Sequence, residues 1–394
     1  MGNTLSAYDP IFYANEAQIA LEKALGMAGR VYRGYDDEKT SREKGSVITV
    51  KVPGTFTAQD APSAAQDVTA SSITMSLDYH KEVKFALTDK ELSYTSQQII
   101  ADHIVPASYA LADKIDQILA GLVTGIPWYT DFTAPAAVAD ITAARKIMFD
   151  NKVNLKDESK LHCMVSGQIE SELLNLSAFT QHQGAGDAGA AAQMSGYLGK
   201  KFGFNFFANQ NAPALTSATV ADLAGAINNG AGYAAGIKSI AVTGMTTAAQ
   251  FRAGDMVLIT GHTQQYVLTA DVLLSGGAGT LSIYGSPNVQ GGGLESAVVD
   301  TQVVTIVLNG GSGATKTNSI MFHEGFAALA MAKLPDFFDG NGVKVFAMPV
   351  DPKSRISVRA RTWSDPNNSK FYVALDALFG VKVLDGNKAV RMRD

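Results

Sequence analysis

Three short patterns in this sequence contain residue types that could carry chemistry, and the first is a run of glycines. Gly184-Ala185-Gly186-Asp187-Ala188-Gly189 has the glycine spacing of a dinucleotide-binding turn. Such a turn binds a pyrophosphate only where it joins a strand to a helix within a βαβ unit. The preceding Gln181-His182-Gln183 is not strand-like. We therefore interpret this run as a flexible loop and expect no bound cofactor.

The other two patterns involve histidine. His323 and Glu324 begin like a zinc-protease helix, but Ala327 occupies the place of the second histidine ligand. His162 and Cys163 are adjacent on a predicted strand, so their side chains should point to opposite faces. This arrangement favours a buried structural cysteine over a nucleophile. We predict no catalytic residue and no metal site, and hence a protein that is not an enzyme.

Two charged stretches are better suited to contacts than to catalysis. The first mixes both signs, which is typical of a solvated face or of ion pairs between molecules. Exposed pairs contribute only about 0.2–1 kcal/mol each, a strength that lets assembly errors be corrected. The second places arginines at alternate positions of a predicted strand, where acidic groups or phosphates could be contacted. The residues are Asp36, Asp37, Glu38, Lys39, Arg42, Glu43 and Lys44 in the first stretch, and Arg355, Arg359 and Arg361 in the second.

The mixed-sign stretch lies in a long arm, residues 31–92. Apolar and polar residues alternate over 47–52 and again over 73–79, which predicts a two-stranded ribbon. An isolated ribbon of this kind is marginally stable in water. We therefore expect the arm to complete itself on a neighbouring molecule, burying apolar surface at roughly 25 cal/mol per Å². The apolar face to be buried there consists of Ile48, Val50 and Val52.

A long helix is predicted after the arm, to act as the spine of an elongated domain. Thr95 and Gln98 have the spacing of a capping box, and apolar residues recur at helical spacing up to the stop signal at 125–127. Pro106 lies inside this pattern, which predicts a kink or a break into two helices. Shorter helices are expected at 14–31 and 134–150.

The composition changes between Gly225 and Gly313, where short apolar runs are separated by glycine-rich turns. This pattern predicts a small all-β barrel or sandwich inserted into an α+β protein. The expected division is 1–30 for an N-terminal arm and helix, 31–92 for the extended arm, 93–235 for the spine helix and a mixed core, 236–317 for the inserted β domain, and 318–394 for the closing strands.

Composition limits the function further. With 394 residues and a net charge of −5, the chain has room for several cores and no overall attraction to nucleic acid. The single cysteine fits a reducing compartment. A secretory signal and a membrane-spanning run are not visible in the sequence. We expect a soluble intracellular product.

The order of these parts resembles the major capsid proteins of tailed double-stranded DNA bacteriophages, in the branch with an inserted β-barrel domain. Three stretches are similar to that family. Asn318–Pro335 contains an aromatic-histidine motif before an alanine-rich run, Phe371–Val381 ends in the Leu-x-Gly-Val of a C-terminal strand pair, and Phe251–Val257 is similar to the opening strand of the inserted domain.

The resemblance implies a structural protein that assembles into the icosahedral shell around phage DNA. The implied partners are copies of the chain in hexamers and pentamers, a scaffolding protein, a portal, and double-stranded DNA bound without sequence specificity, with no membrane. The implied location is the virion capsid, assembled in the host cytoplasm. Two alternatives stay open: a cellular nanocompartment shell of the encapsulin type, and an enzyme with a β accessory domain, which the lack of a convergent acid/base pair disfavours.

Overall fold

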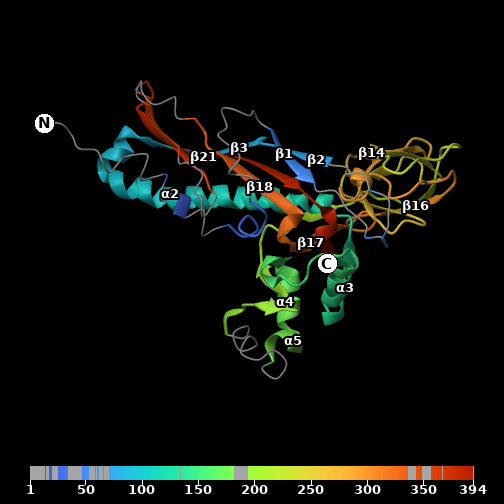
Figure 1. Ribbon diagram of the computed structural model, residues 1–394. Helices are drawn as coiled ribbons and strands as arrows, with labels where there is room; N and C mark the ends of the chain where they lie inside the picture. The colour runs from blue at the N-terminus through green and yellow to red at the C-terminus, as the bar shows by residue number, and fades with distance from the viewer. Residues whose placement is uncertain are drawn as a thin grey trace. The chain divides into compact units, whose positions relative to one another are not determined.

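The computed structural model describes residues 14, 17–19, 25–33, 47–52, 58, 60–61, 65, 71–132, 135–181, 194–335, 343–347, 356–365 and 367–393. The chain forms two compact units, each with helices and strands (Figure 1). The first unit consists of Met1–Val50, Thr74–Leu119 and Ala328–Lys382, and the second of Lys51–Ile73, Ala120–Ala327 and Val383–Asp394.

The first unit is built around a five-stranded sheet. Its strands follow the order β18-β21-β20-β19, and β3 also pairs with β21. β21 has 14 residues and is one continuous strand, where the sequence predicted a pair. Antiparallel registers place Val373 of β21 between Phe85 of β3 and Thr362 of β20. The bounds are β3 (Tyr79–Thr88), β18 (Ala327–Ala332), β19 (Val343–Ala347), β20 (Arg359–Asp365) and β21 (Lys370–Val383).

The predicted spine is the 32-residue helix α2 (Asp89–Ala120). It begins before Thr95, so the predicted capping box is wrong. It continues past Pro106, and the predicted break into two helices is also wrong. Ile104, Leu111 and Ile115 are buried at helical spacing. Phe85 of β3 contacts His103 of α2 with ring centroids 5.7 Å apart, so α2 covers the face of the sheet on which Phe85 lies.

The segment 25–33 is not helical, although a helix was predicted to reach residue 31. Helical backbone occurs at residues 14 and 17–19, whereas 25–33 forms turns and a parallel bridge between Tyr32 and Ala328. The reason lies on α2. The carboxylate of Asp116 accepts the backbone N–H groups of Gly26, Met27 and Ala28 at 2.6–3.2 Å. These amides therefore do not continue a helix.

The second unit contains a seven-stranded sheet of order β4-β22-β17-β5-β7-β6, in which β8 also pairs with β17. The predicted strand at 161–165 is confirmed as β5. In the hydrophobic core of the second unit, Met148 and Phe179 of the helices pack with Cys163 and Met321 of the sheet. The bounds are β4 (Tyr129–Asp131), β5 (Leu161–Val165), β6 (Lys200–Lys201), β7 (Phe204–Ala208), β8 (Ala214–Thr216), β17 (Thr315–His323) and β22 (Ala389–Arg393), with α3 (Val138–Asp150), α4 (Gly167–Leu174) and α5 (Ser177–Thr180).

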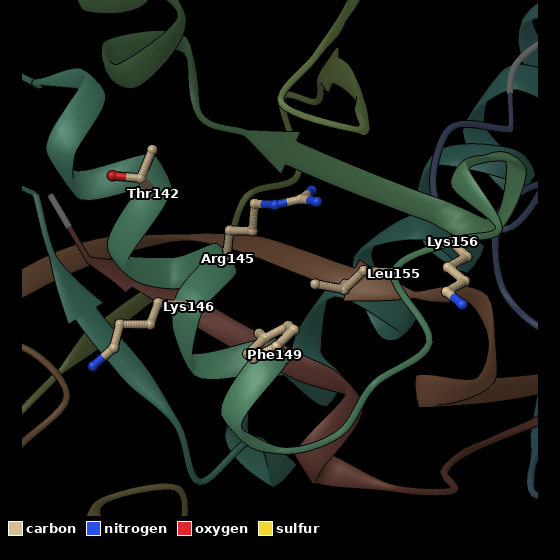
Figure 2. A pocket seen from close by; sticks show the side chains of 6 residues that line it. All are labelled: Thr142, Arg145, Lys146, Phe149, Leu155 and Lys156. Carbon is tan, nitrogen blue, oxygen red and sulfur yellow. The ribbon is translucent and has the colours of Figure 1, made fainter.

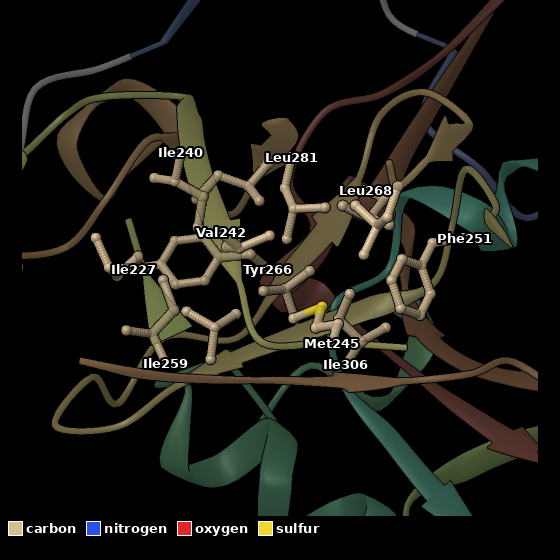
Figure 3. Packing of buried hydrophobic residues seen from close by; sticks show 14 of the residues in the cluster. Ile227, Ile240, Val242, Met245, Phe251, Ile259, Tyr266, Leu268, Leu281 and Ile306 are labelled. Atoms are coloured by element: carbon tan, nitrogen blue, oxygen red, sulfur yellow. The ribbon is translucent and has the colours of Figure 1, made fainter. Parts of the chain in front are cut away.

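The predicted small all-β barrel is confirmed as a closed barrel of order β10-β15-β13-β12-β16-β9. Its interior is filled by Ile240, Tyr266, Leu281 and their neighbours (Figure 3). β9 closes the barrel against β16, so this domain begins before the predicted residue 236. The bounds are β9 (Ala224–Ile227), β10 (Ser239–Thr243), β12 (Met256–Ile259), β13 (Tyr266–Leu268), β15 (Gly279–Tyr284) and β16 (Val303–Val307), with a small sheet of β11 (Gln250–Phe251) and β14 (Val272–Leu273).

Short 3₁₀ turns complete the described structure. They are η3 (Gly121–Gly125), η4 (Glu158–Lys160), η5 (Gln290–Gly292), η6 (Glu324–Phe326) and η7 (Gly386–Lys388).

Candidate assembly surfaces

The predicted ribbon forms a two-stranded sheet from β1 (Val47–Val52) and β2 (Ser71–Ser76). Its side chains alternate in exposure as expected for strands. Ile48 and Val50 are 3% and 5% exposed, whereas Val47 is 43% exposed. On the returning strand Met75 is fully buried. The ribbon therefore has one apolar and one exposed face.

The burial of Ile48 and Val50 corrects one expectation. These side chains were expected to become buried on a neighbouring molecule, but in this structure a single chain already covers them. The exposed face of the ribbon carries Val47, Thr49 and Lys51. Among the described strands, β1 and β2 pair only with each other. A strand edge without a partner is a template for pairing with another chain.

The charged residues predicted at the base of the arm lie outside the described residues. These are Asp36, Asp37, Glu38, Lys39, Arg42, Glu43 and Lys44, and Arg355 of the basic stretch also lies outside them. The side chain of Val52 is likewise not described. The role of the charged arm residues and Val52 between subunits stays a prediction, as does the contact of Arg355 with acidic groups or phosphates.

Arg359 and Arg361 lie on β20 and both reach a buried carboxylate on β21. Arg359 is bidentate to Asp376, with Nε–Oδ1 at 3.0 Å and Nη2–Oδ2 at 2.6 Å. Arg361 Nη2 lies 3.0 Å from Asp376 and 2.6 Å from Glu82 of β3. His80 Nε2 lies 3.3 Å from the same carboxylate. Arg359 and Arg361, two of the three arginines that were predicted to contact acidic groups or phosphates, thus have acidic partners in their own chain.

Sequence reasoning missed Asp376, His80 and Glu82, although the sequence around Asp376 contains a signal. Asp376 is a single carboxylate within the apolar run Val373–Leu378 of a predicted strand. A charge in such a place is stable only when a partner lies opposite. The register supplies that partner, because Arg359 faces Asp376 across the strand pair.

Buried arginines connect the barrel to the seven-stranded sheet within the second unit. Arg391 of β22 donates to the carbonyl oxygen of Gly254 at 2.8 Å and to Asn309 Oδ1. Burial lowers the pKa of Arg391 to about 9, so the side chain is cationic at neutral pH. Burial also raises the pKa of the neighbouring Asp255, which accepts the N–H of Asn309 at 3.1 Å. Arg393 pairs with Asp131 at 2.6 Å.

An open hollow of about 410 Å³ lies against α3 in the second unit (Figure 2). Phe149 and Leu155 form its apolar part, and Phe149 is 70% exposed. Figure 2 shows Phe149 and Leu155 in the middle, with Lys146 and Lys156 on either side. Arg145 and Thr142 complete the lining. Arg145 is held in place by donating to the carbonyl oxygen of Phe202 and by stacking over Phe204 at 5.7 Å.

The three sequence patterns that could carry chemistry were the glycine run and the segments around His162 and His323. Gly184–Gly189 lies outside the described residues. Cys163 is fully buried, and burial raises the pKa of its thiol far above the usual range. His323 accepts the backbone N–H of Gly325 through Nδ1 at 3.0 Å. Within the described part of the chain, no three His, Cys, Asp or Glu side chains are grouped to hold a metal ion, and no helix there is apolar and long enough to cross a membrane.

One constellation in the barrel has the residue types of a serine–histidine pair. His262 lies 3.1 Å from Ser296 Oγ through Nε2 and 2.7 Å from the Tyr266 hydroxyl through Nδ1. The Tyr266 hydroxyl accepts the N–H of Glu295 at 2.8 Å, and the tautomer of His262 with its proton on Nε2 lets this hydroxyl donate its own proton to Nδ1. In that tautomer the ring proton of His262 is donated to Ser296 Oγ. A histidine that donates to a serine does not activate it as a nucleophile.

Comparison with known proteins gives distant likenesses. No family model matches the sequence, and no curated protein matches it. The chain is similar to a structure from Mycobacterium phage Che8, with 13% identity and a TM-score of 0.49 over 93% of this chain and 90% of that chain. It is similar to the capsid of cyanophage P-SCSP1u, with 11% identity and a TM-score of 0.45 over 89% and 83%.

A virus-like particle from Pyrococcus furiosus is also similar, with 7% identity and a TM-score of 0.38 over 97% of this chain and 98% of that chain. Solved structures that resemble this chain thus include phage capsids and a virus-like particle. At these identities and TM-scores, the likenesses by themselves define no family and no activity.

Proposed function

We propose that this protein is the shell subunit of a tailed bacteriophage, assembling into an icosahedral capsid of hexamers and pentamers around double-stranded DNA. The observation that carries the proposal is the β1–β2 ribbon, whose strands pair only with each other among the described strands. It is supported by the order of the parts: ribbon, 32-residue helix, mixed α/β core, inserted barrel and late return strands. This is the order that the sequence resemblance implies for the capsid family with an inserted barrel.

The mechanism consists of many modest contacts for each subunit. The ribbon keeps Ile48 and Val50 inside its own chain and presents its exposed face and open edges to a neighbour. Backbone pairing at an edge gives affinity without a deep pocket. Exposed ion pairs add only about 0.2–1 kcal/mol each. No single contact then fixes a misplaced subunit, and the shell is stabilised by their number.

The proposal is tested by removing the ribbon and by changing its exposed face. Deletion of residues 40–71 should leave folded subunits that form no shells in negative-stain electron microscopy. The deletion also removes the buried Ile48 and Val50, so a gentler variant, Val47→Asp with Lys51→Glu, is needed beside it. Both changed side chains are exposed, and circular dichroism should show an intact fold. Normal shells from both variants would refute the role of the ribbon.

The contents of the particles separate a phage capsid from a cellular compartment. Shells purified from infected cells should contain double-stranded DNA and a portal, with a scaffolding protein in their precursors. Protein cargo without DNA would favour the nanocompartment instead. A protein that stays monomeric at every concentration, measured by sedimentation, would contradict both.

A further inference from the structure

The hollow on α3 is an unusual exposed feature for a helix that packs against a sheet. The buried side of α3 carries Ile141, Ala144 and Met148. Phe149 points away from that side and is 70% exposed. A large exposed aromatic residue beside a hollow is typical of an interaction site.

The chemistry of the lining defines what the hollow fits. Arg145, Lys146 and Lys156 supply three cationic groups, while its lining includes no acidic side chain. Lys146 is 78% exposed and its pair with Asp150 spans 3.7 Å, which is a loose contact. The complementary surface is therefore an apolar side chain next to a carboxylate.

The chain itself exposes such a surface at the 299–303 loop of the barrel. Val299 is 68% exposed and Val303 is 47% exposed, with the exposed Asp300 between them. Thr301 adopts a positive φ of 64°, a conformation that is unfavourable for a β-branched residue. Strain of this kind is often retained where a loop has to present a particular shape.

The loop is also held in one conformation by hydrogen bonds. Gln302 accepts the N–H of Val299 through Oε1 at 3.0 Å and donates to the carbonyl oxygen of Thr260. Asp300 accepts the N–H of Asn229 through Oδ1 at 2.9 Å, and its side chain stays exposed. A preorganised loop loses little entropy on binding.

We propose that the 299–303 loop of one copy docks into the α3 hollow of the next, with Val299 on Phe149 and Leu155 and Asp300 beside Lys156. The contact joins two different surfaces of identical chains, so it is heterologous and can close into a ring. This inference rests on the proposed function, because it names one of the contacts by which shell subunits would associate.

The experiment compares wild type with Phe149→Asp, Lys156→Glu, Asp300→Lys and the charge swap Lys156→Glu/Asp300→Lys. Sedimentation equilibrium measures the association of soluble subunits, and electron microscopy counts shells. Phe149→Asp should weaken association at least about tenfold. Each single charge reversal should weaken it about two- to fivefold, and the swap should restore most of that loss. Tyr197→Asp, at an exposed aromatic outside the hollow, is the matched control and should associate normally.

The possible outcomes separate the docking from the proposed function. Rescue by the charge swap supports the docking. Phe149→Asp or Asp300→Lys subunits that associate like wild type overturn it, even where wild type forms shells and the proposed function stands. Single variants that fail without rescue by the swap overturn the assignment of this loop to this hollow. A wild type that never associates contradicts the proposed function instead, and circular dichroism of each variant excludes a folding defect.

Discussion

Arg359 and Asp376 form a bidentate ion pair that is buried between β20 and β21 in the first unit. The Asp376 side chain is fully buried and that of Arg359 is 6% exposed. The guanidinium also donates to the carbonyl oxygen of Pro335 at 3.1 Å. Without Arg359 the buried Asp376 would lose its bidentate partner and keep the single contacts of Arg361 at 3.0 Å and His80 at 3.3 Å.

Arg359→Ala should therefore lower the free energy of unfolding by about 3 kcal/mol, the lower end of the cost of breaking a buried pair, because Arg361 still contacts Asp376. The double variant Arg359→Met/Asp376→Leu should recover most of this, since neither buried charge remains and Arg361, which loses Asp376, keeps Glu82 at 2.6 Å. Arg361→Ala should cost less because that side chain is 22% exposed. The chain has two tryptophans, Trp128 in the second unit and Trp363 in the first. Urea titration followed by Trp363 fluorescence in a Trp128→Phe background measures the first unit alone.

The outcome that contradicts this account is a double variant as unstable as Arg359→Ala. Packing of the long arginine stem, rather than charge, would then be the main contribution.

The carboxylate of Asp116 fixes the N-terminal segment through three backbone amides. Asp116→Ala leaves the buried N–H groups of Met27 and Ala28 without an acceptor, at about 1–3 kcal/mol for each. We expect the amides of 26–28 to lose hydrogen-exchange protection while those of α2 near Leu111 keep it. Asp113→Ala, on the exposed face of the same helix, is the control and should leave both regions protected. Protection unchanged in Asp116→Ala would show that the Tyr32–Ala328 bridge alone holds the segment.

How much of this fold was predictable depends on whether its causes are local. The barrel and β5 were predicted because apolar runs and glycine turns are written in consecutive residues. The helix at 14–31 was overextended because the cause of its end, Asp116, lies 88 to 90 residues further along the chain. Thr95 formed a plausible capping box, yet α2 begins at Asp89, directly after β3 ends at Thr88.

The candidate surfaces were likewise predicted where the cause is local and missed where it lies in distant residues. Alternation along the ribbon predicted which residues share a face, and Ile48 and Val50 do share the buried one. It did not predict that one chain alone would cover that face, because a covering surface comes from distant residues. Arg359 and Arg361 were recognised as a basic strand, whereas their neutralisation by Asp376 and Glu82 depends on the strand register.

Gly380 lies on β21 where the turn between β2 and β3 passes very close. A Cβ at this position would lie 2.3 Å from the backbone carbonyl oxygen of Ser76, an atom that cannot move without moving the strand. Gly380→Ala should therefore destabilise the first unit by about 1–3 kcal/mol, as overpacking does. Gly29→Ala in the same unit is the matched control, because a Cβ at Gly29 would have no atom within 4 Å. Equal urea midpoints for the two variants, followed by Trp363 fluorescence, would show that the turn shifts freely.

The histidine in the barrel should make its stability depend on pH. Burial lowers the pKa of His262 below its ordinary value, and the charge of Glu295 opposes this shift. Although burial acts in the other direction, hydrogen bonds from the amides of Gln264 and Thr263 hold the pKa of Glu295 below its usual range. Burial raises the pKa of Tyr266 to about 12, so its hydroxyl keeps its proton throughout the physiological range.

Protonation of His262 would place a second N–H donor on the Tyr266 hydroxyl, which already accepts from Glu295 and would lose the acceptor for its own proton. The unfolded chain takes up a proton near pH 6.5, whereas the folded barrel resists it to lower pH. The stability conferred by the neutral ring is therefore fully present above about pH 6.5 and is lost as the pH falls toward the folded pKa.

Hydrogen exchange of barrel amides should be faster at pH 5.5 than at pH 7.5, after correction for the intrinsic exchange rate. His262→Asn should lose this dependence, and His103→Asn, on α2 of the first unit, should keep it. A wild-type barrel equally protected at both pH values would show that the Tyr266–His262–Ser296 bonds rearrange to accept the charge.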